Sequence, residues 1–343
     1  MQRDLLQCKI SLALKRKLNL DFYSHEDNVN VNNLWKGTHM PLKSGLIAAT
    51  LGGALAMGTI TSPLSAQDEA AGNAQSQRTL LMSDEFNGEV LDRELWTVVG
   101  PEIWFNNEQQ VYIDDPAVLS IVTGIAGADD GALMLRPLFQ PGIDPNTERK
   151  ADFVSARIHS KGKFDFTHGR AEARIKLPDA EGVWPAWWLL GNGQWPTTGE
   201  IDIMEYVGEK DWIGVAMHGT NYSGETPFVN KSYFPEGTDA TDWHTYAVEW
   251  TDDVITFEVD GKLIYRATRS MVAHYGKWRF DTPQHLILNF AVGGIYPFKT
   301  NGLTEPYVGV PAETVEKIKT GEIAMLVDWV RVYAPGGTAE TEK

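Results

Sequence analysis

Three carboxylates stand close together in the middle of the chain, within the stretch Gly199–Tyr206. Glu200, Asp202 and Glu205 are separated there by apolar residues, and near-alternation of this kind indicates a β-strand. Carboxyl groups crowded on one strand can divide acid/base and nucleophilic work between them, because proximity pushes their pKa values apart. The stretch therefore predicts a catalytic centre, and the elements around it must explain how the three groups meet.

On a regular strand Glu205 would point away from the other two carboxylates, since it follows Asp202 by three positions and residues two apart share a face. One extra residue in a β-bulge restores the phase. We expect the bulge at or near Met204, with Ile201 and Ile203 facing the core. The alternative is a solvated face carrying ordinary acids, although like charges crowded on one face destabilise a sheet.

A tryptophan-rich run, Val183–Leu190, precedes the carboxylates. Alternation places Trp184 and Trp188 on one face of a strand and Trp187 on the other. Indole rings stack on the apolar faces of sugars, so two of them on one face predict the floor of a polysaccharide groove. The alternative, that these tryptophans belong to the core, is what we expect for Trp187.

The composition limits the partners of the chain. A formal net charge of −16 over 343 residues argues against nucleic acid and anionic membranes and fits a neutral polymer. The single cysteine, Cys8, excludes a disulfide framework and a cysteine-bound zinc site. The eight histidines show no HExxH spacing. An apolar fraction of 43 % is ample for one large core.

The N-terminal region has the pattern of a signal peptide that starts late, at Met40, with Lys43 before an apolar stretch and a cleavage site after Ala66. We expect a secreted, extracellular or periplasmic, monomeric protein; an amphipathic arm on a membrane-anchored protein is the alternative. The expected division is a misassigned N-terminal extension (1–39), a signal peptide (40–66), a linker (67–79), a catalytic domain (80–335) and a disordered tail (336–343).

Short runs of period two, broken by Gly, Pro, Asn and Asp, fill the rest of the chain and indicate an all-β sandwich or jelly roll in one domain. Asp260-Gly261 predicts a tight hairpin turn, and residues 311–320 predict the one longer helix, ended by Gly321. The predicted strands are 132–136, 153–159, 170–177, 245–250, 254–259, 286–292 and 325–333.

The segment Gly199–Gly208 resembles the signature of glycoside hydrolase family 16, in its bulge-containing, laminarinase-like branch. The resemblance extends over about residues 80–334. It implies a concanavalin-like β-jelly-roll of two curved antiparallel sheets and retaining hydrolysis by double displacement. The other segments that carry it, in the order of the family, are 84–88, 106–108, 169–174, 184–188, 217–219, 246–250, 286–294 and 327–333.

Roles follow from the resemblance residue by residue. Glu200 would be the nucleophile, Glu205 the acid and then the base, and Asp202 the helper that hydrogen-bonds the nucleophile and keeps Glu205 protonated. The substrate-binding residues that it implies, together with the groove tryptophans Trp184 and Trp188, are His218, Asn107, Arg157 and, at the edge of the cleft, Trp195.

The resemblance implies no cofactor for catalysis and a structural calcium ion far from the chemistry. Its ligands would be Glu85, the carbonyl of Gly131 and Asp328, and hard oxygen ligands suit calcium. The expected substrate is a β-1,3-glucan or mixed β-1,3/1,4-glucan. A galactan such as agar or carrageenan, a non-catalytic glucan-binding role and transglycosylation are the alternatives, because the segments 190–200, 219–242 and 294–298 that shape the cleft depart from the pattern or are long.

Overall fold

The computed structural model describes residues 78–143 and 151–336. The predicted extension and signal peptide, almost all of the predicted linker and most of the predicted tail lie outside the described residues.

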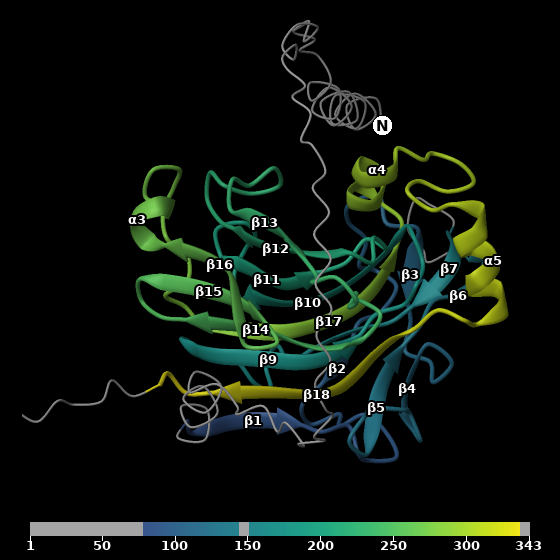
Figure 1. Ribbon diagram of the computed structural model, residues 1–343, viewed down its shortest axis with the longest axis horizontal. Helices are drawn as coiled ribbons and strands as arrows, with labels where there is room; N and C mark the ends of the chain where they lie inside the picture. Colours follow the sequence, from purple (N-terminus) through teal and green to yellow (C-terminus); the bar gives the residue numbers. More distant parts are fainter. Residues whose placement is uncertain (1–77, 144–150, 337–343) are drawn as a thin grey trace, which may run out of the picture. The chain divides into compact units, whose positions relative to one another are not determined.

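Two antiparallel sheets form the layers seen in Figure 1. One layer carries the predicted catalytic strand, and we call it the cleft sheet. In spatial order it contains β13 (Val229–Tyr233), β12 (Trp212–His218), β11 (Glu200–Glu205), β10 (Val183–Gly191), β17 (Gln284–Val292), β8 (Arg157–His159) and β2 (Thr97–Val98).

The second layer, the outer sheet, closes the sandwich. Its edge strand β1 (Leu80–Asp84) pairs with β18. The remaining order is β16 (Lys262–Thr268), β15 (Val254–Val259), β14 (Trp243–Trp250), β9 (Gly169–Lys176), β18 (Met325–Tyr333), β5 (Gly131–Leu135) and β4 (Leu119–Thr123).

A third, small sheet and three helices complete the described residues. The small sheet joins β3 (Gln110–Tyr112), β7 (Ala151–Ser155) and β6 (Leu138–Ile143), and β3–β7 is its parallel pair. Among the described residues, none of the helices has the length and apolarity needed to span a bilayer. The helices are α3 (Arg269–Val272), α4 (Ile295–Asn301) and α5 (Ala312–Thr320).

The hydrophobic core lies where the facing sides of the two main sheets meet. Strand alternation sends every second side chain inwards, and aromatic side chains dominate the filling. Each fully buried large apolar side chain stabilises the fold by about 1.5–3 kcal/mol relative to exposure. The largest buried side chains include Trp96, Trp187, Trp250, Tyr206, Tyr246 and Phe290.

The fold confirms the predicted all-β sandwich. Both central residues of the predicted Asp260-Gly261 turn have positive φ angles, 51° and 73°. The predicted helix is α5, which follows Pro311 and ends at Gly321, a residue with φ of 75°. Helices α3 and α4 were not among the predicted elements, because four and seven residues show too little periodicity.

The predicted strand 153–159 is wrong as a single element. The chain leaves the small sheet after Ser155 and enters the cleft sheet at Arg157. Ala156 at the junction is fully buried, and its carbonyl accepts a hydrogen bond from the amide of Phe290. Burial continues across the junction, so the sequence pattern shows no break there.

Candidate active site

β11 carries a β-bulge between its second and third carboxylates. Asp202 pairs with Ala216 on β12, and Glu205 pairs with Gly214, so three steps along β11 match two steps along β12. The register towards β10 shifts at the same point. Met204, in this interval, is fully buried. The bulge is therefore where the sequence predicts it.

The bulge brings the three predicted catalytic carboxylates to one cavity. Glu200, Asp202 and Glu205 all line a cavity of about 270 Å³ over the cleft sheet. Asp202, the middle group, is only 5 % exposed, whereas the other two are partly exposed. A sugar ring lying on this floor would meet all three.

Burial raises the pKa of Glu200, Asp202 and Glu205, each to about 8. The charge of Asp202 raises the pKa of both glutamates further, while the charge of His218 acts in the opposite direction. Groups so close to one another titrate as a set. At neutral pH the set therefore keeps at least one proton, which is what an acid catalyst requires.

The two glutamates have different neighbours. The indole Nε1 of Trp184 donates a hydrogen bond of 2.9 Å to Oε1 of Glu205. His218 lies at the other end of the strand, with Nε2 3.3 Å from Oδ2 of Asp202 and 3.7 Å from Oε1 of Glu200. The nearby charges of His218 and Arg157 favour an ionised Glu200.

The predicted tryptophan alternation is also observed. Trp184 and Trp188 line the cavity, and Trp187 is 0 % exposed on the core side. Nε1 of Trp188 donates a 2.8 Å hydrogen bond to Asn289, and the guanidinium of Arg157 lies 4.8 Å from the centre of the Trp188 ring. The second indole is thus held in place from two sides, while its neighbourhood stays open to ligand.

The other predicted substrate-binding residues differ in position. Trp195 lines the cavity with 48 % of its surface exposed, and its ring centre is 6.4 Å from that of His218. Arg157 also lines the cavity. Asn107 is exposed and is not among the lining residues; its neighbour Asn106 is. The prediction therefore identified the right loop but not the residue on the wall.

Several lining residues were not predicted. Asn289 is a lone polar residue inside the apolar strand β17, and that contrast is a signal in the sequence. Glu108 belongs to the resembling segment 106–108; its Oε2 accepts hydrogen bonds from Gln110 and from the Tyr112 hydroxyl. Phe105 has no comparable signal, because an aromatic residue in a loop is ambiguous.

Tyr296 on α4 is a further unpredicted neighbour of the site. Its ring packs edge-to-face on Trp184, with centres 5.6 Å apart. Its hydroxyl lies 2.9 Å from where a side-chain carbon on Gly214 would stand, and Gly214 is the partner of Glu205 on β12. A glycine is therefore needed at position 214 to leave room for this hydroxyl.

The predicted calcium ligands are occupied by arginines. Both carboxylate oxygens of Glu85 accept hydrogen bonds from Arg331, at 3.0 and 2.7 Å. Asp328 is 1 % exposed and pairs with Arg174. A cation at Asp328 would have to displace that guanidinium, so these residues fit calcium poorly as they stand. The calcium ion stays a prediction.

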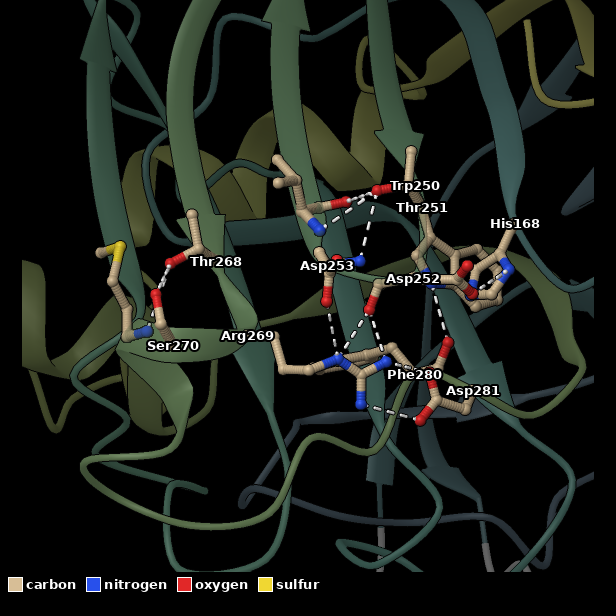
Figure 2. Close-up of polar contacts among 12 residues, drawn as sticks. His168, Trp250, Thr251, Asp252, Asp253, Thr268, Arg269, Ser270, Phe280 and Asp281 are labelled. Atoms are coloured by element: carbon tan, nitrogen blue, oxygen red, sulfur yellow. Dashed lines mark hydrogen bonds and ion pairs between the residues drawn. The ribbon is translucent and has the colours of Figure 1, made fainter. Parts of the chain in front are cut away.

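A second group of ligand-type side chains lies near α3, away from the cavity lining (Figure 2). His168 Nδ1 is 3.2 Å from a carboxylate oxygen of Asp252. Arg269 contacts Asp281 at 3.0 Å and Asp253 at 3.2 Å. A guanidinium already neutralises these acids, so the group reads as a structural clamp between the β14–β15 turn, α3 and residue 281.

Known proteins share this architecture. The family model "Glycosyl hydrolases family 16" matches residues 104–306. A β-glucanase of Rhodothermus marinus is 34 % identical over 74 % of this chain and 84 % of its own. The laminarinase catalytic domain of Thermotoga maritima superposes with a TM-score of 0.64 at 32 % identity, covering 76 % of this chain and 99 % of that one. The endo-β-1,3-glucanase of Pyrococcus furiosus gives 0.64 at 34 %, over 74 % and 94 %.

A jelly roll with carboxylates and indoles on the floor of one cavity defines the protein as a glycoside hydrolase. Within that class, the chain belongs to glycoside hydrolase family 16.

Proposed function

We propose that the protein is a secreted endo-β-glucanase that hydrolyses β-1,3 links, or mixed β-1,3/1,4 links, with retention of configuration. The observation that carries the proposal is the bulge in β11, which turns Glu205 into the cavity beside Glu200 and Asp202. The relatives named above are β-glucanases and laminarinases, which supports the substrate class.

The chemistry would run in two displacements. A carboxylate oxygen of Glu200 attacks the anomeric carbon, the glycosidic bond breaks, and Glu205 gives its proton to the leaving oxygen. Water then attacks the glycosyl-enzyme, Glu205 takes the proton of the water, and Glu200 is released. Retaining enzymes hold the two carboxyl groups about 5–5.5 Å apart. A bulge shortens the strand between the two groups and so favours that approach.

Asp202 would act through its neighbours. Its charge raises the pKa of both glutamates, which favours a protonated Glu205 before the first displacement. The hydrogen bond from Trp184 stabilises a negative Glu205 and so offsets part of that rise. The acid thus lies between opposing influences, as suits a group that must give and then recover a proton.

The charge of the cavity lining favours a neutral polymer. Arg157 is the one cation among the lining residues of this cavity, against Glu108 and the three carboxylates of β11. A sulfated galactan would meet net repulsion there. A neutral galactan such as agarose remains the second candidate, because indoles stack on either sugar.

Product analysis tests the proposal. The purified protein is incubated with laminarin, lichenan, agarose, carrageenan and xyloglucan, and released oligosaccharides are separated by size while proton NMR follows the first anomer formed. We expect oligosaccharides from laminarin or lichenan with β-anomers first. Release from galactans alone would overturn the substrate proposal, and α-anomers first would overturn retention.

Secretion and assembly are tested separately. Sequencing of the secreted protein from its N-terminus is expected to begin at Gln67, whereas a membrane-retained form beginning near Met1 would contradict the proposed signal peptide. Size-exclusion chromatography with light scattering is expected to give a monomer, and a concentration-dependent dimer would contradict that.

A further inference from the structure

Three side chains with metal-binding atoms converge at the Glu200 end of the cavity. One ligand atom each of Glu200, Asp202 and His218 lies within 4.8 Å of the other two. Their strands are adjacent, and Glu200 pairs directly with His218 across β11 and β12. The group is therefore held by sheet register and not by mobile loops.

Asp202 presents an unused ligand atom to this group. Its side chain is more than nine-tenths buried, and its Oδ2 makes no hydrogen bond with any described residue. That atom faces Nε2 of His218 at 3.3 Å. A buried carboxylate oxygen without a hydrogen bond is costly, so it marks a place where a further ligand is missing.

The distances match a small tetrahedral ion. Zn²⁺ binds imidazole nitrogen and carboxylate oxygen at about 2.0–2.2 Å, which puts two ligands of one tetrahedron about 3.4 Å apart. Nε2 of His218 lies 3.3 Å from Asp202 and 3.7 Å from Glu200. Rotamer-scale adjustments would therefore bring all three atoms onto one ion, with the open cavity side left for water.

We propose that Glu200, Asp202 and His218 form an inhibitory site for Zn²⁺ or a similar borderline divalent cation. The ion would occupy the carboxylate oxygen of the nucleophile and exclude the sugar from the cavity. An imidazole ligand favours Zn²⁺ over Ca²⁺, which prefers six to eight oxygens. The inhibition rests on the proposed function; the binding does not.

Binding is tested by calorimetric titration of the metal-free full chain with zinc chloride, with bound zinc confirmed by elemental analysis after gel filtration. We expect one equivalent bound at this site. Loss of a mere supporting partner weakens metal sites about 10–100-fold, so His218→Ala is expected to weaken binding about a hundredfold. Circular dichroism checks folding, and Glu200→Gln, which preserves shape, serves if the alanine variant does not fold.

The chain offers a matched control. His168 also lies near two aspartates, Asp252 and Asp281, but Arg269 already pairs with those acids. His168→Ala is therefore expected to leave zinc affinity within about twofold of wild type. Zinc binding lost in His168→Ala but kept in His218→Ala would overturn the assignment, as would no saturable binding below millimolar zinc.

Inhibition is tested with laminarin as substrate. Zinc is expected to inhibit competitively, with full recovery on adding a chelator, and His218→Ala should need about a hundredfold more zinc for the same fractional inhibition of its own activity. An enzyme that binds zinc at His218 yet stays fully active would overturn the inhibitory part. A protein that binds zinc but cleaves no glucan would refute the proposed function and leave the metal site standing.

Discussion

Glu200 and Glu205 have the same side chain on the same strand, but their surroundings prepare them for different work. Glu200 lies beside His218 and within the field of Arg157, and both cations favour its ionised form. Glu205 is bound by the indole of Trp184 and packs near Tyr296. The two groups can thus be told apart by substrates that differ in their need for a proton.

Glu200→Gln and Glu205→Gln are each expected to lower kcat on laminarin about a thousandfold or more, because each removes a group that acts in the transition state. On an aryl glycoside whose leaving group needs no proton, Glu205→Gln should regain the first displacement as a burst of released phenol. Glu200→Gln should show no burst. Near-normal turnover by either variant on laminarin would reject its role.

Asp202→Asn is expected to move the basic limb of the pH profile of kcat/KM to lower pH. The charge of Asp202 raises the pKa of Glu205, so its removal lets Glu205 lose its proton earlier on the alkaline side. The profile is measured on laminarin for both proteins. An unchanged basic limb, with only a lower plateau, would mean that Asp202 does not act on the acid.

At the scale of elements, the bulge in β11 and the tight turn after β15 are the local features on which the site and the outer sheet depend. The β15–β16 turn is held by Asp260, whose Oδ1 accepts the amide of Thr245 at 2.9 Å and whose Oδ2 lies 2.7 Å from Nδ1 of His244. The turn thus ties β14 to the hairpin next to it.

This contact predicts a pH window of stability. Burial lowers the pKa of His244, but the Asp260 hydrogen bond and charge outweigh it and raise the pKa above its ordinary 6.5. Burial alone would raise the pKa of Asp260; the hydrogen bonds from His244 and Thr245 lower it below 3.8. The histidine contribution is complete below pH 6.5 and fades as pH rises through the raised pKa, and the aspartate contribution is complete above pH 3.8 and fades below it.

The stabilisation should therefore be largest between about pH 4 and 6.5. His244→Gln is expected to lose about 1 kcal/mol there, a modest figure because Asp260 is half exposed and screened by water, and to lose less at pH 9. Urea unfolding at both pH values measures the difference. An equal loss at both would show that charge plays no part.

At the scale of the whole molecule, the outer sheet carries the two acids for which calcium was predicted, and arginines neutralise both. If Arg174 is the counter-charge of buried Asp328, chelation should leave the melting temperature of the wild type unchanged. In Arg174→Gln the buried carboxylate loses its partner, which costs about 3–5 kcal/mol in buried pairs, and added Ca²⁺ should recover part of the loss.

Differential scanning fluorimetry with and without chelator decides between the two expectations. A clear fall of the wild-type melting temperature, reversed by Ca²⁺, would support the predicted calcium ion and would mean that Arg174 moves aside. The catalytic rate at a temperature well below the transition serves as the control, since none of the β11 carboxylates lies among these residues.

Local rules were enough for the parts of the molecule that local residues decide. The phase slip before Glu205 predicts the bulge, and Asp-Gly predicts its turn, because in both cases the cause lies within a few positions. The passage between sheets at Ala156 was missed, since burial on both sides masks it. Asn106, Tyr296 and the Arg174–Asp328 pair depend on segments far apart in sequence, so no local pattern could place them.

Trp184 has two tasks that cannot be independent. Its ring lines the floor on which a sugar would stack, and its indole nitrogen holds the acid at 2.9 Å. Thermodynamic linkage is reciprocal: if ligand stacking shifts the indole, it changes the proton affinity of Glu205, and the protonation state of Glu205 changes ligand affinity by the same factor. Substrate arrival would then itself adjust the acid, and oligosaccharide affinity measured across pH would report that adjustment without any turnover.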